Sequence, residues 1–184
     1  MHNLIVEGIE LVGKSYFIHD LWNAIENENN SGQGILDGCI WINTDVGLYG
    51  TQDGWQLIDK NVELAKVLTH RNIIFEKLHL TQHLYTQQKQ KELFKRYDDI
   101  LLSLGFKVIV LTIDEDESLI EKRLKERLQS NQSYKRIAKD PSWYLEKQAG
   151  LLEIASKTSL PVLKLNSLII PHTLYKDALD WINN

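Results

Sequence analysis

The stretch Gly8-Ile9-Glu10-Leu11-Val12-Gly13-Lys14-Ser15 decides the fold, because it matches the pattern G-x-x-x-x-G-K-[ST] of a phosphate-binding loop. The apolar, β-branched run at residues 4–6 predicts a buried strand before the loop. Apolar residues recur at helical spacing over residues 16–26, which predicts a helix after it. Strand, loop and helix in this order are the context in which the motif binds phosphate.

The chemistry of this loop follows from its backbone. N–H groups of the loop and of the helix start point inward, and the helix N-terminus adds partial positive charge. Gly8 and Gly13 permit unusual backbone angles and close approach of a ligand. We expect Lys14 to reach the β and γ phosphates of ATP and Ser15 to ligate Mg²⁺. The rest of the stretch expected to contact this cofactor is Ile9, Glu10, Leu11, Val12 and Tyr16.

Length and composition set the class of protein. The chain has 184 residues, of which 43% are hydrophobic and 25% charged, and this predicts one domain over residues 1–184. A net charge of −4 argues against a dedicated nucleic-acid binder. The single cysteine, Cys39, excludes an internal disulfide and a cysteine zinc cluster. With no membrane-length apolar run and no signal peptide, we expect a cytoplasmic protein without a membrane partner. The sequence leaves open whether the chain forms a homodimer.

The remaining pattern alternates strands with helices. Strands are predicted at residues 39–42, 72–76, 107–112 and 161–165. Helices are predicted at residues 55–69, 84–104, 116–128, 141–157 and 174–182, with Gly105 as a C-cap and Asp140 as an N-cap. The polar loop at residues 43–53 follows a strand, where substrate contacts are usually made. We therefore predict an α/β fold, a three-layer sandwich with a five-stranded parallel sheet of the P-loop NTPase type.

Charged side chains near the predicted strand ends are the candidate catalytic groups. Glu76 ends an apolar strand, a position from which an acid can hold Mg²⁺, although a surface acid fits as well. Arg123 and Arg127 lie four residues apart on one helix and can neutralise charge on the γ phosphate, unless that helix is merely a solvated basic face. The polar segment at about residues 129–139 carries Lys135 and Arg136 and is predicted to be a mobile lid.

Histidine and aromatic residues give weaker signals. His79 and His83 stand four apart, but no third ligand follows a zinc pattern, so core packing or substrate contact explains them better than a metal does. Aromatic residues are more often core than stacking platforms. Tyr85 and Trp55 are the better candidates for stacking on a base, because both stand near predicted strand ends.

Two segments carry a resemblance to a known family. Val6-Glu7-Gly8-Ile9-Glu10, followed by Gly13-Lys14-Ser15, is similar to the opening of thymidylate kinases, apolar-Glu-Gly-x-Asp-x-x-Gly-Lys-[Ser/Thr]. Residues 76–85 resemble the family's segment Asp-Arg-aromatic-x-x-Ser-x-x-apolar-Tyr at the same spacing. The order of the later elements also matches, so the resemblance covers most of the chain. Deoxynucleoside kinases share the Glu-Gly opening and are a close second.

The resemblance implies roles for individual residues. Glu10 stands beside the acceptor's sugar, Glu76 at the Mg²⁺-associated acid, and Lys77 at the arginine that grips the acceptor phosphate. Tyr85 stands near the base pocket, and Thr81 stands at the serine of the same segment, so both join the expected substrate residues. The chain departs from the family where Lys77 replaces arginine and loses its bidentate fork. Glutamate replaces aspartate at positions 10 and 76, Leu11 and Val12 replace small residues, and residues 43–54 lack the family's arginine.

The function expected from these observations is transfer of a phosphoryl group from ATP to a small acceptor. Lys14, Arg127 and Glu76 are the expected catalytic residues, with Ser15 and Glu76 holding Mg²⁺. The acceptor is expected to be a nucleoside monophosphate or a deoxynucleoside, and for a hydroxyl acceptor Glu10 or Glu76 can take the proton. A kinase for a non-nucleotide molecule and a nucleotide-binding regulator with little transfer activity remain alternatives.

Overall fold

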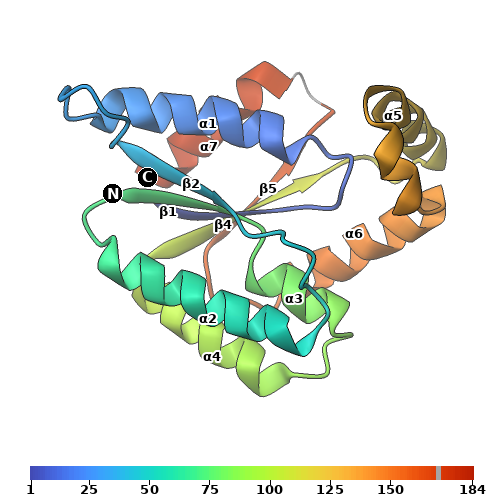
Figure 1. Ribbon diagram of the computed structural model, residues 1–184, viewed down its shortest axis with the longest axis horizontal. Coiled ribbons are helices and arrows are strands. Elements are labelled where there is room, and N and C mark those ends of the chain that lie inside the picture. The colour runs from blue at the N-terminus through green and yellow to red at the C-terminus, as the bar shows by residue number, and fades with distance from the viewer. Residues whose placement is uncertain (169–170) are drawn as a thin grey trace.

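Five parallel strands form one sheet in the order β2-β3-β1-β4-β5 (Figure 1). The computed structural model describes residues 1–168 and 171–184. The strands are β1 (Asn3–Glu7), β2 (Cys39–Asn43), β3 (Asn72–Glu76), β4 (Phe106–Thr112) and β5 (Val162–Asn166). The prediction of an α/β fold with a five-stranded parallel sheet is confirmed.

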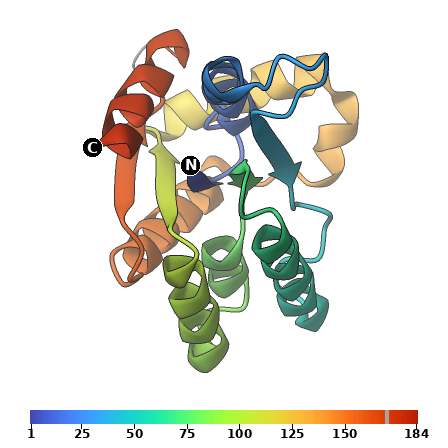
Figure 2. The same ribbon diagram turned by 90° about the vertical axis from the view of Figure 1, so that its left-hand side faces the viewer.

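Helices cover both faces of the sheet, which gives three layers (Figures 1 and 2). One face carries α1 (Lys14–Asn29) and α7 (Pro171–Asn183), and the other carries α2 (Gln52–Val67), α3 (His79–Tyr85), α4 (Lys91–Ser103) and α6 (Pro141–Ala155). Beyond the carboxyl ends of the strands lie α5 (Glu117–Ser130) and the short 3₁₀ helix η1 (Gln132–Arg136). No helix in the described residues is both long and apolar enough to cross a membrane.

The prediction of a single helix at residues 84–104 is wrong. The chain forms α3 and α4 instead, and Gln87 and Gln88 between them have left-handed φ angles of 53° and 55°. The reversal lays Phe94 of α4 against the ring of His83 in α3, with 4.3 Å between the ring centroids. Both helices bury one face in the same layer, and this burial overrides the helix propensity of the Gln- and Lys-rich run between them.

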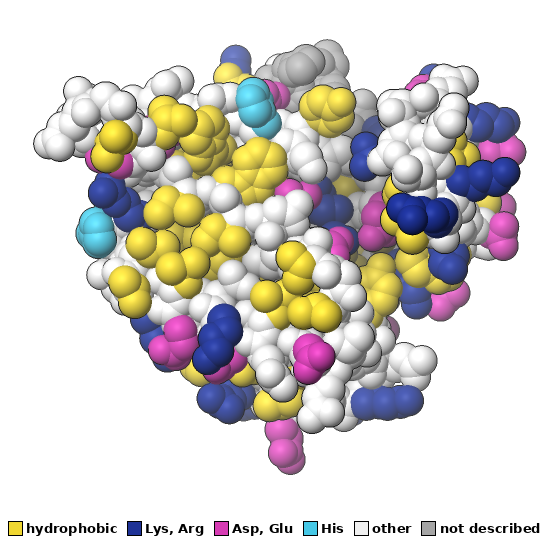
Figure 3. Space-filling view, in the orientation of Figure 1, with side chains coloured by type: hydrophobic (Ala, Val, Ile, Leu, Met, Phe, Trp, Pro, Cys, Tyr) yellow, Lys and Arg dark blue, Asp and Glu magenta, His cyan; other side chains and the backbone are white. Residues whose placement is uncertain are grey.

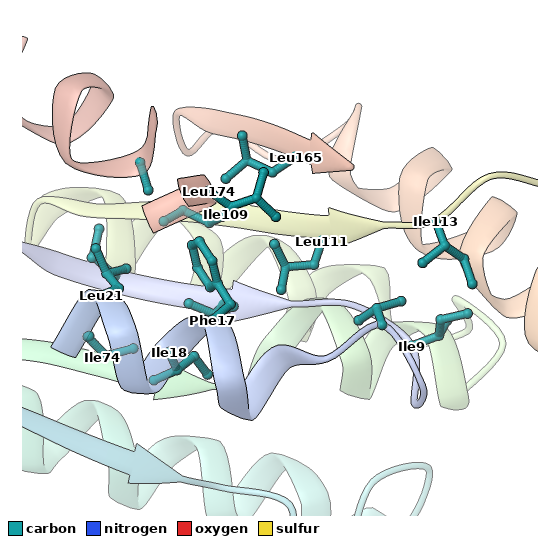
Figure 4. Close-up of a cluster of buried hydrophobic side chains, with 14 of the residues drawn as sticks. Ile9, Phe17, Ile18, Leu21, Ile74, Ile109, Leu111, Ile113, Leu165 and Leu174 are labelled. Carbon is teal, nitrogen blue, oxygen red and sulfur yellow. The ribbon is translucent and has the colours of Figure 1, made fainter. Parts of the chain in front are cut away.

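The core lies on both sides of the sheet because successive strand residues point to opposite faces. On the α1 and α7 side, Leu4 and Val6 of β1 meet Phe17, Ile18 and Leu21 of α1. Figure 4 shows these α1 side chains lying between the helix and the strands, next to labelled residues of β3, β4 and β5. Burying a side chain of this size contributes about 1.5–3 kcal/mol, so α1 is held firmly over β1.

The connections place a crevice at one end of the sheet. The chain leaves β1 through α1 on one face, and it leaves the neighbouring β3 through α3 on the other face (Figure 1). In open α/β sheets, ligands bind outside the carboxyl ends of strands at such a switch point. Glu7 and Glu76, the last residues of β1 and β3, therefore mark where a site is expected.

Candidate functional site

The loop between β1 and α1 is shaped by its glycines and pinned by its apolar residues. Gly8 has φ 150°, and a Cβ there would lie 2.8 Å from the carbonyl oxygen of Leu111. Only glycine allows this approach to β4. Gly13 has φ 82° and stands at the N-cap of α1, while Ile9 and Val12 are buried in the core. The loop backbone is thereby fixed over the N-terminus of α1, whose partial positive charge favours anions.

Lys14 is buried at the start of α1, and its ammonium folds back on the loop. Nζ donates to the carbonyl oxygens of Gly8 and Ile9, each at 2.8 Å. Burial, and next the nearby charge of Lys77, lower the pKa of Lys14 to about 8. An anion placed in the loop would bring compensating negative charge to this ammonium.

Ser15 and Glu76 form the pair that fits a magnesium ion. The Ser15 hydroxyl donates to Oε1 of Glu76 at 3.1 Å, and Oε2 of Glu76 is buried without a hydrogen-bond partner among the described residues. Mg²⁺ prefers oxygen ligands and typically takes one or two from the protein, with the rest from phosphates and water. A hydroxyl, a carboxylate and an unpartnered carboxylate oxygen beside a phosphate-binding backbone match that set.

A cavity of about 820 Å³ opens over this loop. Figure 3 shows it as a hollow between the α5 region and the body of the molecule, with basic and acidic side chains on its walls. Among the predicted site residues, those that line it are Glu10, Leu11, Val12, Gly13, Lys14, Ser15, Tyr16, Glu76, Lys77, Arg123 and Arg127. Residues separated by more than a hundred positions in the chain therefore share one cavity, as the predicted site requires.

The two arginines of α5 differ in what they contact. Arg123 Nη1 donates to the carbonyl oxygen of Leu11 at 2.7 Å, so this side chain braces the loop. Arg127 lies over the ring of Tyr134, with its Cζ 5.5 Å from the ring centroid. Arg127 faces the cavity from α5, and of the two it is the better placed to meet a phosphate.

A second set of charges lies at the carboxyl ends of β1, β2 and β3. Lys77 Nζ donates to Glu10 Oε1 at 3.1 Å and to Asp45 Oδ2 at 2.6 Å. Burial is the largest single effect and acts to raise the pKa of both carboxyls, but the charges of Lys77 and Lys14 and the hydrogen bonds from Lys77 and the backbone together hold each pKa below its usual value. The same cluster raises the pKa of Lys77 against the opposing effect of burial. All three groups are therefore charged at neutral pH.

Several residues of the cavity were not predicted from the sequence. They are Phe17, Asn43, Asp45, Glu126, Ser130, Tyr134, Ser167 and Leu174. The sequence indicated the region of Asn43 and Asp45 but not the two residues themselves, because residues 43–53 were predicted as a loop that contacts substrate. Nothing in the local sequence separates Asp45 from other surface acids, since its role depends on a lysine 32 positions away.

Thr81 and Tyr85, both predicted to contact substrate, lie in different surroundings. Thr81 is buried, and its hydroxyl donates to Glu7 Oε2 at 2.5 Å. Thr81 lines neither the cavity over the loop nor the second cavity described next. Tyr85 lines a neighbouring cavity of about 580 Å³ together with Trp55. The Trp55 ring stacks on Tyr97 at 5.5 Å, which places most of it in the core. Burial, and next the charge of Glu10 from the larger cavity, raise the pKa of Tyr85 to about 12.

His79 and His83 pack in the core. Both rings stack on Phe94, at 5.4 Å and 4.3 Å between centroids, and Nε2 of His79 lies 3.1 Å from Asp98 Oδ1. Within residues 1–168 and 171–184, no group of three or more His, Cys, Asp and Glu could hold a metal ion. Of the two explanations expected for these histidines, core packing and substrate contact, the structure shows core packing.

The segment predicted as a lid contacts α6 through Tyr134 and Lys139. Residues 129–130 complete α5, and η1 buries Tyr134, whose hydroxyl lies 3.1 Å from that of Tyr144. Lys135 and Arg136 are exposed and stand outside the cavity lining. Ser130 and Tyr134 thus carry the contact between this segment and the cavity, and mobility of the segment stays a prediction.

Comparisons with known proteins identify the fold. No family model matches the chain, and no curated protein matches it. Among solved structures, the chain is similar to the YorR protein of Bacillus subtilis, which was crystallised in complex with phosphorylated GDP. The two are 15% identical over 98% of this chain and 95% of that chain, with a TM-score of 0.70. A likeness at this identity shows that the two chains share a fold.

Proposed function

We propose that the protein is a P-loop kinase, similar to thymidylate and deoxynucleoside kinases, that transfers a phosphoryl group from Mg²⁺-ATP to a small molecule. The observation that carries the proposal is the pairing of the Ser15 hydroxyl with Glu76 beside the Lys14 loop. The complex of the YorR protein with phosphorylated GDP supports a nucleotide in this fold. Phosphoryl transfer needs positioned phosphates and neutralised charge more than covalent chemistry, and this site supplies both.

The donor half of the site has one task for each group. The backbone N–H groups of residues 8–15 bind the phosphates, and Lys14 exchanges its loop carbonyls for the β and γ phosphate oxygens. Ser15 and Glu76 would hold Mg²⁺, and the ion would neutralise negative charge on the departing ADP. Arg127 stabilises the charge that develops on the transferred group.

The acceptor half favours a hydroxyl over a phosphate. Glu10 and Asp45 bring two negative charges against the single positive charge of Lys77, so the cluster has a net charge of −1. A monophosphate would bring further negative charge to a cluster that is already negative. A neutral hydroxyl, as on a deoxynucleoside, meets no such repulsion. Its proton passes to the Asp45 carboxylate while its oxygen bonds to the γ phosphorus and the bond to ADP breaks.

The position of Lys77 supports the second candidate, a nucleoside monophosphate acceptor. If Lys77 leaves Glu10 and Asp45, its ammonium can meet a phosphate in the same crevice. The two candidates make opposite predictions for Asp45→Asn. A hydroxyl acceptor loses its base and turnover falls, whereas a monophosphate acceptor loses one repulsive charge and binds more tightly.

The test is transfer from radiolabelled ATP with Mg²⁺ to a panel of nucleosides, nucleoside monophosphates and sugars. We expect labelled product from a nucleoside. Lys14→Ala should abolish transfer, whereas Lys135→Ala, the same change at an exposed lysine outside the cavity, should leave it unchanged. Transfer by Lys14→Ala at the wild-type rate, or no transfer to any compound of the panel, would contradict the proposal.

A further inference from the structure

Lys77 stands in a backbone conformation that the chain must hold in place. Its φ angle is 62°, in the left-handed region that non-glycine residues rarely adopt, and the next residue, Leu78, is the N-cap of the short helix α3. Its N–H donates to the carbonyl oxygen of Val6 at 2.9 Å, and its own carbonyl oxygen accepts from the Thr44 hydroxyl at 2.8 Å. A conformation of this kind persists only where the surroundings enforce it.

Glu7 supplies the enforcement on the helix side of this turn. Its carboxylate accepts from the Leu78 N–H at 3.0 Å, from the Thr81 N–H at 3.4 Å and from the Thr81 hydroxyl at 2.5 Å. Glu7 is fully buried, and it is the last residue of β1, next to Gly8. It caps the N-terminus of α3 from another strand, at the end where a negative charge is favourable.

We propose that Glu7 is a positioning residue for the acceptor half of the site, a role that rests on the proposed function. By capping α3 it keeps Leu78 in place, and Leu78 keeps Lys77 turned toward Glu10 and Asp45. This role also accounts for Thr81, whose hydroxyl serves the Glu7 carboxylate in place of a substrate.

A positioning role has a kinetic signature that differs from a loss of folded protein. If the cap is broken, only a fraction of molecules holds the turn that the acceptor binds, and the apparent KM rises by the inverse of that fraction. Saturating acceptor restores the turn, so kcat stays near the wild-type value. A merely structural defect lowers the concentration of active enzyme, which lowers kcat and leaves KM unchanged.

The variants are Glu7→Gln, which sets an amide N–H₂ against the Thr81 hydroxyl, and Thr81→Val, which removes the hydroxyl at nearly constant shape. We expect each to raise the acceptor KM about tenfold with kcat and the KM for ATP within about twofold. The double variant should equal either single one, because both break the same contact. Thr81→Ser keeps the hydroxyl and should restore the wild-type KM.

The matched control is Asn72→Ala. Asn72 is also buried, and it donates to the Gly38 carbonyl oxygen at 2.7 Å at the opposite end of the sheet from the site. This variant should lose stability without a change in acceptor KM. Hydrogen exchange gives a readout that needs no transfer activity: the Leu78 and Thr81 amides should exchange faster in Glu7→Gln than in the wild type.

The outcomes separate the two proposals. A wild type that transfers phosphate, with an unchanged acceptor KM in both Glu7→Gln and Thr81→Val, overturns the positioning role alone. A wild type that transfers nothing overturns the proposed function and the positioning role with it, and the exchange rates then decide only whether Glu7 caps α3. A raised acceptor KM at constant kcat, together with faster exchange of the two amides, supports the positioning role.

Discussion

Gly54 offers a test of how the polar loop at residues 43–53 is held, because the neighbouring side chain of Gln82 leaves no room for a methyl group. A Cβ on Gly54 would lie 2.3 Å from Gln82 Oε1 and 2.6 Å from Gln82 Cδ. Gln82 is fully buried, and it accepts from the Gly50 N–H and donates to the Thr51 carbonyl oxygen, both at 2.8 Å. Gly54→Ala must therefore displace the side chain that ties α3 to the start of α2.

The expected loss of stability can be worked from these contacts. Overpacking a filled site costs about 1–3 kcal/mol. A displaced Gln82 leaves the Gly50 N–H and the Thr51 carbonyl without their partner, at about 1 kcal/mol or more for each group that stays buried. The higher helix propensity of alanine than of glycine stabilises the folded protein by at most about 1 kcal/mol. The net loss is about 2–4 kcal/mol, which for a chain of this size lowers Tm by at least about 4–8 °C.

The assay is calorimetric and urea unfolding of Gly54→Ala beside Gly150→Ala. Gly150 also lies in a helix, but a Cβ there meets only Cδ1 of Leu84, at 2.8 Å, the end of a side chain that can rotate. Gly150→Ala should be neutral or stabilising. A Gly54→Ala protein as stable as the wild type, or an equal loss in both variants, would refute the reasoning. Gln82→Ala combined with Gly54→Ala should relieve the overlap.

Further predictions concern acid stability and turnover. Burial would raise the pKa of Asp98, but hydrogen bonds from His79, the Thr158 hydroxyl and a backbone amide hold it below the usual 3.8. The stability that the Asp98 carboxylate contributes is fully present at a pH above its pKa in the unfolded chain. It is lost as the pH falls through the lower pKa that this group has in the folded protein. Asp98→Asn should therefore flatten the fall in the free energy of unfolding below about pH 4, measured by urea titration. Arg127→Ala should lower kcat about a hundredfold with little change in the KM for ATP, whereas Lys135→Ala should change neither.

The sheet was predictable because its signals are local. Each strand is a short apolar run, and the phosphate-loop pattern fixes how the first strand and helix connect. The predicted strands at residues 72–76 and 107–112 match β3 and β4 to within one residue. Gly105, predicted as a C-cap, follows α4 with φ 73°. Periodicity and turn chemistry are enough wherever neighbouring residues alone set the structure.

The errors arose where distant contacts decide the outcome. The helix predicted at residues 84–104 breaks at Gln87 and Gln88, because α3 and α4 bury faces that one straight helix cannot bury together. Substrate contact by Thr81, expected from its place in a motif, stays a prediction, but the motif gave no sign that its hydroxyl meets a carboxylate 74 positions earlier in the chain. Neither propensity nor spacing carries information on such pairings.

The same distinction separates the two halves of the candidate site. Most of the donor half lies in one continuous stretch, and Glu76 of β3 and Arg127 of α5 complete it. The phosphate-binding chemistry of Gly8 to Ser15 therefore follows from the sequence as soon as this stretch is recognised. The acceptor half joins the ends of three strands, and its character depends on Glu10, Asp45 and Lys77 meeting in space. Lysine in place of the arginine expected from the resemblance then has a physical explanation. A compact ammonium is enough for two carboxylates at 3.1 Å and 2.6 Å, whereas the planar fork of arginine is matched to a phosphate. The substitution thus favours a hydroxyl acceptor over a monophosphate.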